Sequence, residues 1–283
     1  MKRIDSHHHF WQLSRGDYSW LTKDLGVLYR DYLAVDIRNE LTYANVSETI
    51  LVQAADTVAE TEFMFLNAYT QNFISGVVGW VDMESSNVFE QLSWFMENPY
   101  FKGIRPMIQD IENVDWMLKP ELTPVFKFLE DNDLSFDALV LPKHLANLKE
   151  LLTRHPKLRV VIDHGGKPEI SKALGVDIAK SVNRQWAQDI EELAKNTNVF
   201  CKLSGLVTEA GSTATYNDIE PYMAHLFKCF GVNKLMWGSD WPVVNINSDY
   251  ATWIDIASTF IEKLTRQQQV SIWSGAAKRF YKL

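Results

Sequence analysis

Eight short apolar runs, rich in β-branched residues, recur along the whole chain and are separated by segments of helix length. These runs cover residues 2–7, 49–53, 74–81, 101–107, 134–140, 158–164, 198–203 and 234–240. Most of them are continuously apolar, which is typical of parallel strands that are buried on both faces. The regular alternation of strand and helix predicts an α/β fold built on a parallel sheet.

Amphipathic patterns predict a helix after each run. The predicted helices cover residues 57–72, 87–97, 124–131, 143–154, 185–195, 218–230, 250–263 and 266–281, with a weaker pattern at 30–45. Eight strand–helix units in 283 residues match a closed (β/α)8 TIM barrel, which usually takes about 250 residues. An open doubly wound sheet is the alternative, because a strand count does not establish closure. No Gly/Ser-rich linker divides the chain, so we expect a single domain over residues 1–283.

The composition narrows the class of protein. Hydrophobic residues make up 46% of the chain and charged residues 23%, as expected for a globular protein with a large core. The net charge is −8 and the basic residues are scattered, which argues against nucleic acid and against an anionic membrane as partners. No apolar stretch is long enough to span a bilayer. Cys201 and Cys229 have neither metal-type nor redox-type spacing, so we expect reduced thiols and a cytoplasmic protein.

The two ends of the chain carry the most informative polar residues. His7 and His9 lie on one face of the first run while His8 points to the opposite face, because strand side chains alternate. Asp240 ends the eighth run. Barrel closure places the first strand beside the eighth and brings these residues together at the carboxyl end, where such barrels have their active sites. Two imidazoles and a carboxylate are suited to binding a metal or activating water.

Polar residues also mark the ends of the other runs. They are Gln53, Trp80, Asp82, Arg105, Asp137, His164, Lys202 and Ser204. Asp240 is the candidate general base, and His164 could orient the substrate or bind a metal. Arg105 and Lys202 could stabilise negative charge on a substrate oxygen. Each residue alone also has a structural interpretation: Arg105 could pair with Asp82, Gln53 could cap a helix, and Lys202 could be exposed at a loop start.

Motifs for covalent or phosphate chemistry are absent from the sequence. The chain has no Gly-rich phosphate loop and no Gly-x-Ser-x-Gly nucleophile elbow, and neither cysteine has a His partner in the local sequence. Hydrolysis by an activated water is therefore favoured over a covalent mechanism.

Three motifs resemble those of the amidohydrolase superfamily. They are Asp5-x-His7-x-His9, Asp163-His164-Gly165-Gly166-Lys167-Pro168 and Gly238-Ser239-Asp240-Trp241-Pro242. The resemblance covers nearly the full length and is strongest to the amidohydrolase 2 branch of sugar-acid and aromatic-acid lactonases. The segments around Gln53, Trp80, Arg105 and 201–209 resemble the L-fucono- and L-rhamnono-lactonase types. This resemblance implies a (β/α)8 barrel with His7, His9, His164 and Asp240 at the core of the site.

The resemblance also carries expectations about a metal. Many members hold two metals through a carboxylated Lys on strand 4 and a His on strand 5, where this chain has Arg105 and Asp137. A two-metal centre is therefore not expected. One divalent ion, with zinc as the first choice, is expected through His7, His9 and Asp240, with His164 as a further ligand. Metal-independent catalysis remains open as well.

The sequence thus predicts a lactonase of sugar-acid catabolism that acts on a small aldonic-acid lactone. Gln53, Trp80 and Glu209 are expected to shape its pocket, and Arg105 and Lys202 to bind substrate oxygens. Pro106 stands where related sugar lactonases tend to have His, which leaves the sugar preference open. The alternatives are a lactonase for pyrone- or muconolactone-type substrates, a metal-dependent decarboxylase, and an inactive barrel that binds a sugar acid. An exposed aromatic patch could support a homodimer, although the sequence does not locate such a patch.

Overall fold

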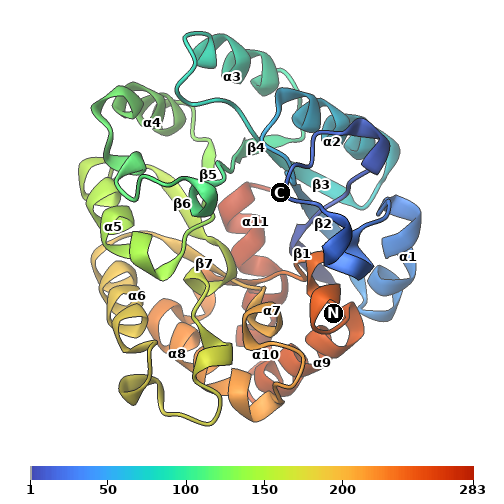
Figure 1. Cartoon of the computed structure of the whole chain (residues 1–283), viewed down its shortest axis with the longest axis vertical. Helices are drawn as coiled ribbons and strands as arrows, with labels where there is room; N and C mark the ends of the chain where they lie inside the picture. Colours follow the sequence, from blue (N-terminus) through green and yellow to red (C-terminus); the bar gives the residue numbers. More distant parts are fainter. Residues whose placement is uncertain (1) are drawn as a thin grey trace.

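The computed structural model, described for residues 2–283, is a single ring of eight parallel strands surrounded by helices (Figure 1). The strands are β1 Arg3–His8, β2 Val46–Val52, β3 Ile74–Gly79, β4 Phe101–Ile104, β5 Ser135–Ala138, β6 Arg159–Ile162, β7 Phe200–Leu203 and β8 Leu235–Trp237. They pair in chain order from β1 to β8. Each of them overlaps one of the predicted runs, and the predicted (β/α)8 barrel is confirmed.

Helices follow the strands and cover the outside of the ring. They are α1 Ala34–Tyr43, α2 Val58–Thr70, α3 Val88–Met96, α4 Thr123–Asp131, α5 Leu145–Arg154, α6 Arg184–Asn196, α7 Leu206–Ala210, α8 Tyr216–Lys234, α9 Tyr250–Ile261, α10 Arg266–Val270 and α11 Ala276–Tyr281. All nine predicted helical segments contain helix. The last one is interrupted: one π-helical turn, Ser271–Gly275, separates α10 from α11. The short α7 was not predicted.

Residues from the two ends of the chain close the ring. His8 and Trp241 form a parallel bridge, and the backbone N–H of Asp240 donates to the carbonyl of His7 at 2.8 Å. The Ser6 hydroxyl donates to the Trp237 carbonyl at 2.7 Å. These bonds hold the first strand beside the last, and they bring the two ends of the predicted site together.

β1 departs from strict alternation where it enters the site. Ile4 packs with the apolar residues of the ring interior, and His7, three residues later, also faces inward toward Lys202. A register irregularity between Asp5 and His8 makes this possible. Asp5 Oδ1 stabilises it by accepting the N–H groups of His7 and Ser239. His8 then faces outward, where its Nε2 lies 2.9 Å from Thr49 Oγ1.

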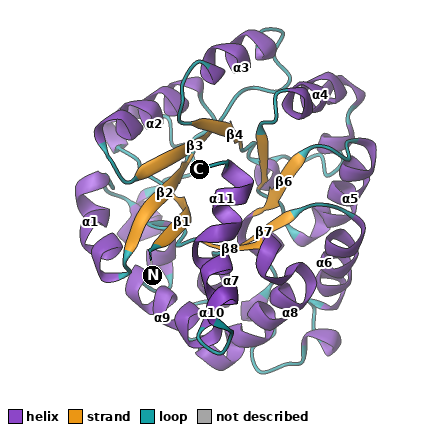
Figure 2. Cartoon of the chain, turned by 180° about the vertical axis from the view of Figure 1, so that it is seen from behind, coloured by secondary structure: helices purple, strands orange, loops and turns teal. Residues whose placement is uncertain are grey.

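α11 fills the lower part of the ring, as both views show (Figures 1 and 2). Phe280 and Tyr281 pack there with buried residues from the strands; the strand residues are Ile4, Ile50, Val52, Val78, Val161 and Met236. The lower part of the interior is therefore a packed core.

Candidate functional site

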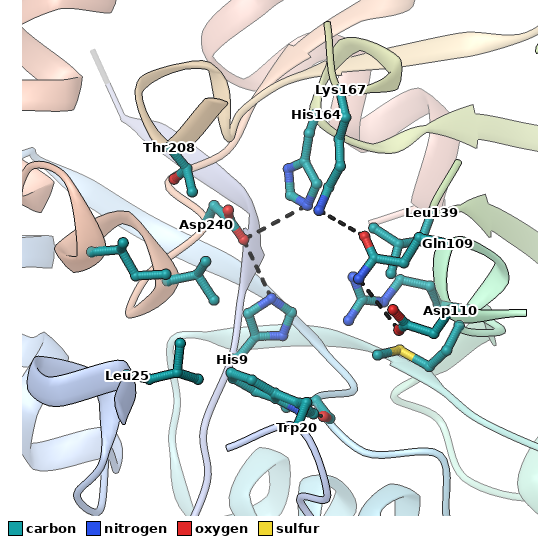
Figure 3. A pocket seen from close by; sticks show the side chains of 15 residues that line it. His9, Trp20, Leu25, Gln109, Asp110, Leu139, His164, Lys167, Thr208 and Asp240 are labelled. Atoms are coloured by element: carbon teal, nitrogen blue, oxygen red, sulfur yellow. Dashed lines mark hydrogen bonds and ion pairs between the residues drawn. The ribbon is translucent and has the colours of Figure 1, made fainter. Parts of the chain in front are cut away.

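A cavity of about 260 Å³ opens at the carboxyl ends of the strands (Figure 3). Its lining consists of His9, Trp20, Leu25, Ala54, Arg105, Met107, Gln109, Asp110, Leu139, His164, Lys167, Thr208, Asp240, Val243 and Ile246. The volume suits a small organic ligand.

Three imidazoles and one carboxylate converge at the floor of this cavity. Asp240 Oδ1 lies 3.4 Å from His9 Nε2, 3.6 Å from His7 Nε2 and 3.7 Å from His164 Nε2. The Nε2 atoms of His7 and His9 are 3.2 Å apart. All four residues are buried, so the floor is a compact polar cluster shielded from bulk water.

The other ring nitrogens of His9 and His164 are used to hold these side chains. His9 Nδ1 lies 2.8 Å from the Val52 carbonyl, which can only accept, so His9 carries its proton on Nδ1 and presents a lone pair on Nε2. His164 Nδ1 lies 2.9 Å from Ser204 Oγ. Both rings therefore direct Nε2 toward Asp240.

Unusual backbone conformations position His164 and Asp240. Their φ angles are +53° and +59°, in the left-handed region that non-glycine residues seldom occupy. His164, Gly165, Gly166 and Lys167 form a continuous left-handed turn after β6. Such conformations cluster at functional sites, where surrounding contacts maintain them.

Lys202 lies beneath the floor, inside the ring. Its ammonium donates to Asp137 Oδ2 at 2.6 Å and lies 3.0 Å from His7 Nδ1. It also forms an ion pair with Asp163 Oδ1 at 2.9 Å, although neither Asp163 oxygen accepts a hydrogen bond of regular geometry within the described residues. Burial alone would raise the pKa of Asp163, but the charge of Lys202 and the nearby His7 imidazole hold it well below its usual value. Burial raises the pKa of Asp137 despite Lys202.

Arg105 and Gln53 are held together at the side of the floor. The Arg105 guanidinium donates to the Gln53 carbonyl at 2.5 Å, and the Gln53 amide donates to the Arg105 carbonyl at 2.6 Å. Arg105 also lies 3.6 Å from Asp163, and its Nε is buried without a partner among the described residues. Arg105 therefore pairs with Asp163 and keeps an unused donor.

The walls of the cavity differ in polarity. Lys167 donates to Gln109 at 2.7 Å, and Gln109 donates to Asp110 at 3.3 Å, which forms a polar wall. The larger apolar residues of the lining are Trp20, Leu25, Met107, Leu139, Val243 and Ile246. A ligand with both hydroxyl and alkyl groups fits such a cavity.

The floor has the donor set and spacing that a single divalent ion requires. Metal–ligand bonds of about 2.0–2.1 Å in tetrahedral geometry separate donor atoms by about 3.3 Å, and the distances to Asp240 Oδ1 are 3.4–3.7 Å. His9 offers the lone pair that coordination needs. Two overlapping groups have possible ligand atoms within 4.8 Å of one another, His7–His9–Asp240 and His7–Asp163–His164. The residues present therefore fit a metal.

The charge state of the cluster follows from its burial. Burial lowers the pKa of His164 to about 4 and lowers that of His7 and His9. Burial opposes ionisation of Asp240, but His164, His9 and His7 outweigh it and hold the pKa of Asp240 below its usual range. The floor thus combines an ionised carboxylate with neutral imidazoles.

The family model for amidohydrolases matches residues 4–283 of this chain. The chain belongs to the amidohydrolase family. L-fucono-1,5-lactonase of Burkholderia ambifaria is 37% identical to it over 99% of this chain and 96% of that protein. L-fucono-1,5-lactonase of Burkholderia multivorans is 32% identical over 99% and 96%.

Solved amidohydrolase structures share this architecture. A crystal structure of an amidohydrolase from Burkholderia multivorans with bound zinc aligns over 100% of both chains, with a TM-score of 0.92 and 31% identity. The family, this zinc-bound neighbour and the His/Asp clusters together indicate a metal site in the present amidohydrolase. None of the helices in residues 2–283 is long and apolar enough to cross a membrane.

The predicted site residues of this amidohydrolase occupy three different places. His9, His164, Asp240 and Arg105 line the cavity, and His7 lies just behind His9. The other four predicted residues are Gln53, Trp80, Lys202 and Glu209, and none of them is among the described lining residues. Gln53 and Lys202 are fully buried beside and below the floor.

Trp80 and Glu209 are not among the residues that line the cavity. Trp80 follows β3, where its backbone N–H donates to Thr61 Oγ1 at 2.9 Å. Glu209, in α7, is 3.8 Å from the Lys167 ammonium of the polar wall. Burial raises the pKa of Glu209, and Lys167 partly offsets this.

Several residues of the site had no assigned role in the sequence analysis. Asp163 and Lys167 flank His164 within a quoted motif, so proximity to a strand end was a usable signal for both. Trp20 and Leu25 come from residues 9–33, the segment between β1 and α1, whose sequence has no periodic pattern. Nothing local in the sequence indicated that this segment covers the cavity.

Proposed function

We propose that the protein hydrolyses a sugar-acid lactone of the L-fucono-1,5-lactone type to the open hydroxy acid. The observation that carries the proposal is the cluster of Asp240 with three imidazoles at the floor of a cavity of about 260 Å³. Full-length identity of 37% to an L-fucono-1,5-lactonase supports the substrate class. The polar and apolar walls suit a deoxy sugar, which carries hydroxyl groups and a methyl group.

In the proposed reaction Asp240 acts as general base. Its carboxylate takes a proton from water as the water oxygen bonds to the lactone carbonyl carbon. The tetrahedral intermediate then collapses with cleavage of the bond between that carbon and the ring oxygen. Asp240 returns the proton to the ring oxygen, so the product is a hydroxy acid and the carboxylate is regenerated.

Arg105 is proposed to bind the carbonyl oxygen, because it lines the floor and has an unused buried donor. Gln53 supports Arg105 through their reciprocal hydrogen bonds. Lys202 acts through His7, and Glu209 acts through Lys167. The role of Trp80 in shaping the pocket stays a prediction.

His9, His164 and Asp240 would hold a divalent ion, and His7 would join them with its proton on Nδ1. Zinc is the proposed ion, because nitrogen and carboxylate donors in a small tetrahedral set suit it. A divalent ion supplies Lewis acidity that polarises a carbonyl and lowers the pKa of water. Asp240 is proposed to act as the general base both with and without a bound ion.

A pH-indicator assay tests the proposed function. The substrates are L-fucono-1,5-lactone, its mirror image, its 6-hydroxy analogue and a pyrone dicarboxylic acid lactone, each corrected for spontaneous opening. We expect acid release to be fastest with the L-fucono compound. Turnover of the pyrone alone would contradict the substrate class, and silence with all four after zinc addition would contradict the reaction class. Repeating the assay after chelation shows whether the metal contributes to the rate.

A further inference from the structure

A charged cluster lies inside the ring below the cavity floor. Lys202, Asp137 and Asp163 are fully buried, and Tyr281 of α11 is 1% exposed. Burying such charges costs several kcal/mol unless their partners are well placed. The Tyr281 hydroxyl donates to Asp137 Oδ2 at 2.6 Å, and Asp137 in turn accepts from Lys202 at 2.6 Å. Tyr281 and Asp137 therefore hold the Lys202 ammonium directly beneath His7.

The contact between Lys202 and His7 decides where the His7 proton lies. An ammonium group has only donors, and Lys202 Nζ lies 3.0 Å from His7 Nδ1. His7 Nδ1 must then accept, and a neutral imidazole that accepts at Nδ1 carries its proton on Nε2. The competing arrangement would have Nδ1 donate to Asp163 Oδ1, which is farther away at 3.4 Å.

The hydrogen bonds of His9 are consistent with donation from Lys202 to His7. His9 donates from Nδ1 to the Val52 carbonyl, so its Nε2 can only accept. His7 Nε2 lies 3.2 Å from that atom and donates to it. Three successive hydrogen bonds thus run in one direction, from Lys202 to His7, from His7 to His9, and from His9 to Val52.

We propose that Lys202 is a positioning residue that fixes the proton of His7 on Nε2. His7 then acts as a hydrogen-bond donor at the cavity floor and offers no lone pair to a metal there. A divalent ion can take His7 as a ligand only if this proton moves to Nδ1 and the bond from Lys202 is broken. Lys202 therefore weakens metal binding at the same site that its partner His7 helps to form.

Nitrogen-15 NMR of histidine-labelled protein tests the first part directly. The two protonation forms of a neutral imidazole have distinct pairs of ¹⁵N shifts, and the loss of one pair in His7→Asn assigns His7. We expect wild-type His7 to carry its proton on Nε2. A proton on Nδ1 in the metal-free wild-type protein, prepared by chelation, would overturn the proposal, and this measurement needs no substitution at Lys202.

Calorimetric titration with zinc tests the second part. We expect Lys202→Met to bind zinc roughly 10- to 100-fold more tightly than the wild type, the range found when a partner of a ligating histidine changes. Lys167→Met is the matched control, because it removes a positive charge from the cavity wall without a contact to His7. If Lys167→Met tightens binding as much as Lys202→Met, charge alone explains the effect and the proposal is wrong.

The two readouts are independent of lactone turnover. Far-UV circular dichroism first establishes that Lys202→Met is folded, and if it is not, the wild-type NMR result decides. A protein without lactonase activity that still carries the His7 proton on Nε2 would contradict the proposed function and leave this inference standing.

Discussion

His9 and His164 each use one ring nitrogen to stay in place and direct the other toward Asp240. Preorganisation of this kind matters, because an acid–base group works only when it is already within reach of the proton that it moves. The immediate neighbours of the imidazoles are therefore as informative as the imidazoles themselves.

Asp240→Asn is expected to abolish the proposed base while keeping the shape of the side chain. We expect kcat to fall by roughly 10²- to 10⁴-fold, the usual contribution of general acid–base catalysis. Steady-state kinetics with the best lactone measures this effect. Asp82→Asn is the control, because Asp82 is an exposed carboxylate near the end of β3. Equal activity of Asp240→Asn and wild type would exclude the proposed role.

Gly205→Ala is expected to disturb His164. The φ of Gly205 is +66°, and a Cβ there would lie 2.7 Å from the His164 ring. We expect kcat to fall by about 10- to 100-fold, because His164 must shift. Gly175→Ala is a matched control: its φ is +69°, but no atom lies within 4 Å of the added Cβ. Gly175→Ala therefore shows the effect of backbone strain alone, roughly 1–2 kcal/mol, without a steric clash. Equal kcat in the two variants would contradict the steric explanation.

Sequence patterns predict residue positions at strand ends better than the roles of the residues there. His164 and Asp240 come two and three residues after the ends of β6 and β8, so the order of the strands was enough to bring them together. Lys202 lies within β7 and faces the interior, and the sequence does not distinguish this from a position two residues later, where Ser204 reaches His164 at the cavity floor. The direction of the hydrogen bond to His7 depends on three-dimensional contacts alone.

At the level of elements, the segment between β1 and α1 covers part of the cavity and is fastened to α2. Trp20 Nε1 donates to the Ala54 carbonyl at 2.6 Å. Glu60, in the first turn of α2, accepts from the Tyr18 hydroxyl at 2.8 Å and from the Ala54 N–H at 3.0 Å. Glu60 is completely buried, so it ties the segment to the helix from below.

Glu60 gives this connection a predictable dependence on pH. Burial raises its pKa to about 7, although Ala54, Tyr18 and Arg15 lower it in part. Between about pH 4.3, the pKa of an unfolded Glu, and pH 7, the folded state binds more protons than the unfolded state. The contribution of Glu60 to the free energy of unfolding therefore falls as the pH rises through this window.

Glu60→Gln removes this titration. We compare the free energy of unfolding of the variant with that of the wild type at each pH. We expect the difference, variant minus wild type, to rise by on the order of 3 kcal/mol as the pH rises from 4.5 to 7.5. Urea unfolding of both proteins across that range gives the difference. A difference that stays constant with pH, or that changes in the opposite direction, would contradict the raised pKa.

The observed helices differ from the predicted ones in two places. α7 spans only Leu206–Ala210, which is too short to produce a recognisable amphipathic period. The predicted helix at 266–281 contains a π-helical turn before α11, and α11 lies in the ring, where Phe280 and Tyr281 are buried. The sequence predicted a last helix at 266–281 but not that its end enters the ring.

At the scale of the whole molecule, α11 closes the lower end of the ring. Its Tyr281 hydroxyl also contacts the buried charged cluster through Asp137. Tyr281→Phe keeps the packing and removes one donor to Asp137. We expect the free energy of unfolding to fall by about 1–2 kcal/mol, because a buried acceptor loses a partner. Urea unfolding measures this change. Tyr43→Phe, at an exposed tyrosine that donates to Asp255 on the surface, is expected to change stability by less than about 0.5 kcal/mol.

A loss of stability for Tyr281→Phe no larger than that for Tyr43→Phe would show that the Tyr281 hydroxyl contributes nothing measurable.

The overall architecture was the most predictable level, because eight apolar runs and a chain of 283 residues fit few folds other than a closed ring. Closure itself depends on backbone bonds such as that from Asp240 to His7, which no local pattern specifies.

The seam between β1 and β8 also determines when the protein becomes active during its synthesis. Ser239 and His7, which meet at the seam, are 232 residues apart. At translation rates of about 5–20 residues per second, β1 leaves the ribosome roughly 10–50 s before its partner strand exists. Throughout that time the histidines of the first strand lack Asp240, the proposed base. The nascent chain is thus without its proposed activity until the last strand emerges, and premature termination yields a product that is inactive rather than partly active.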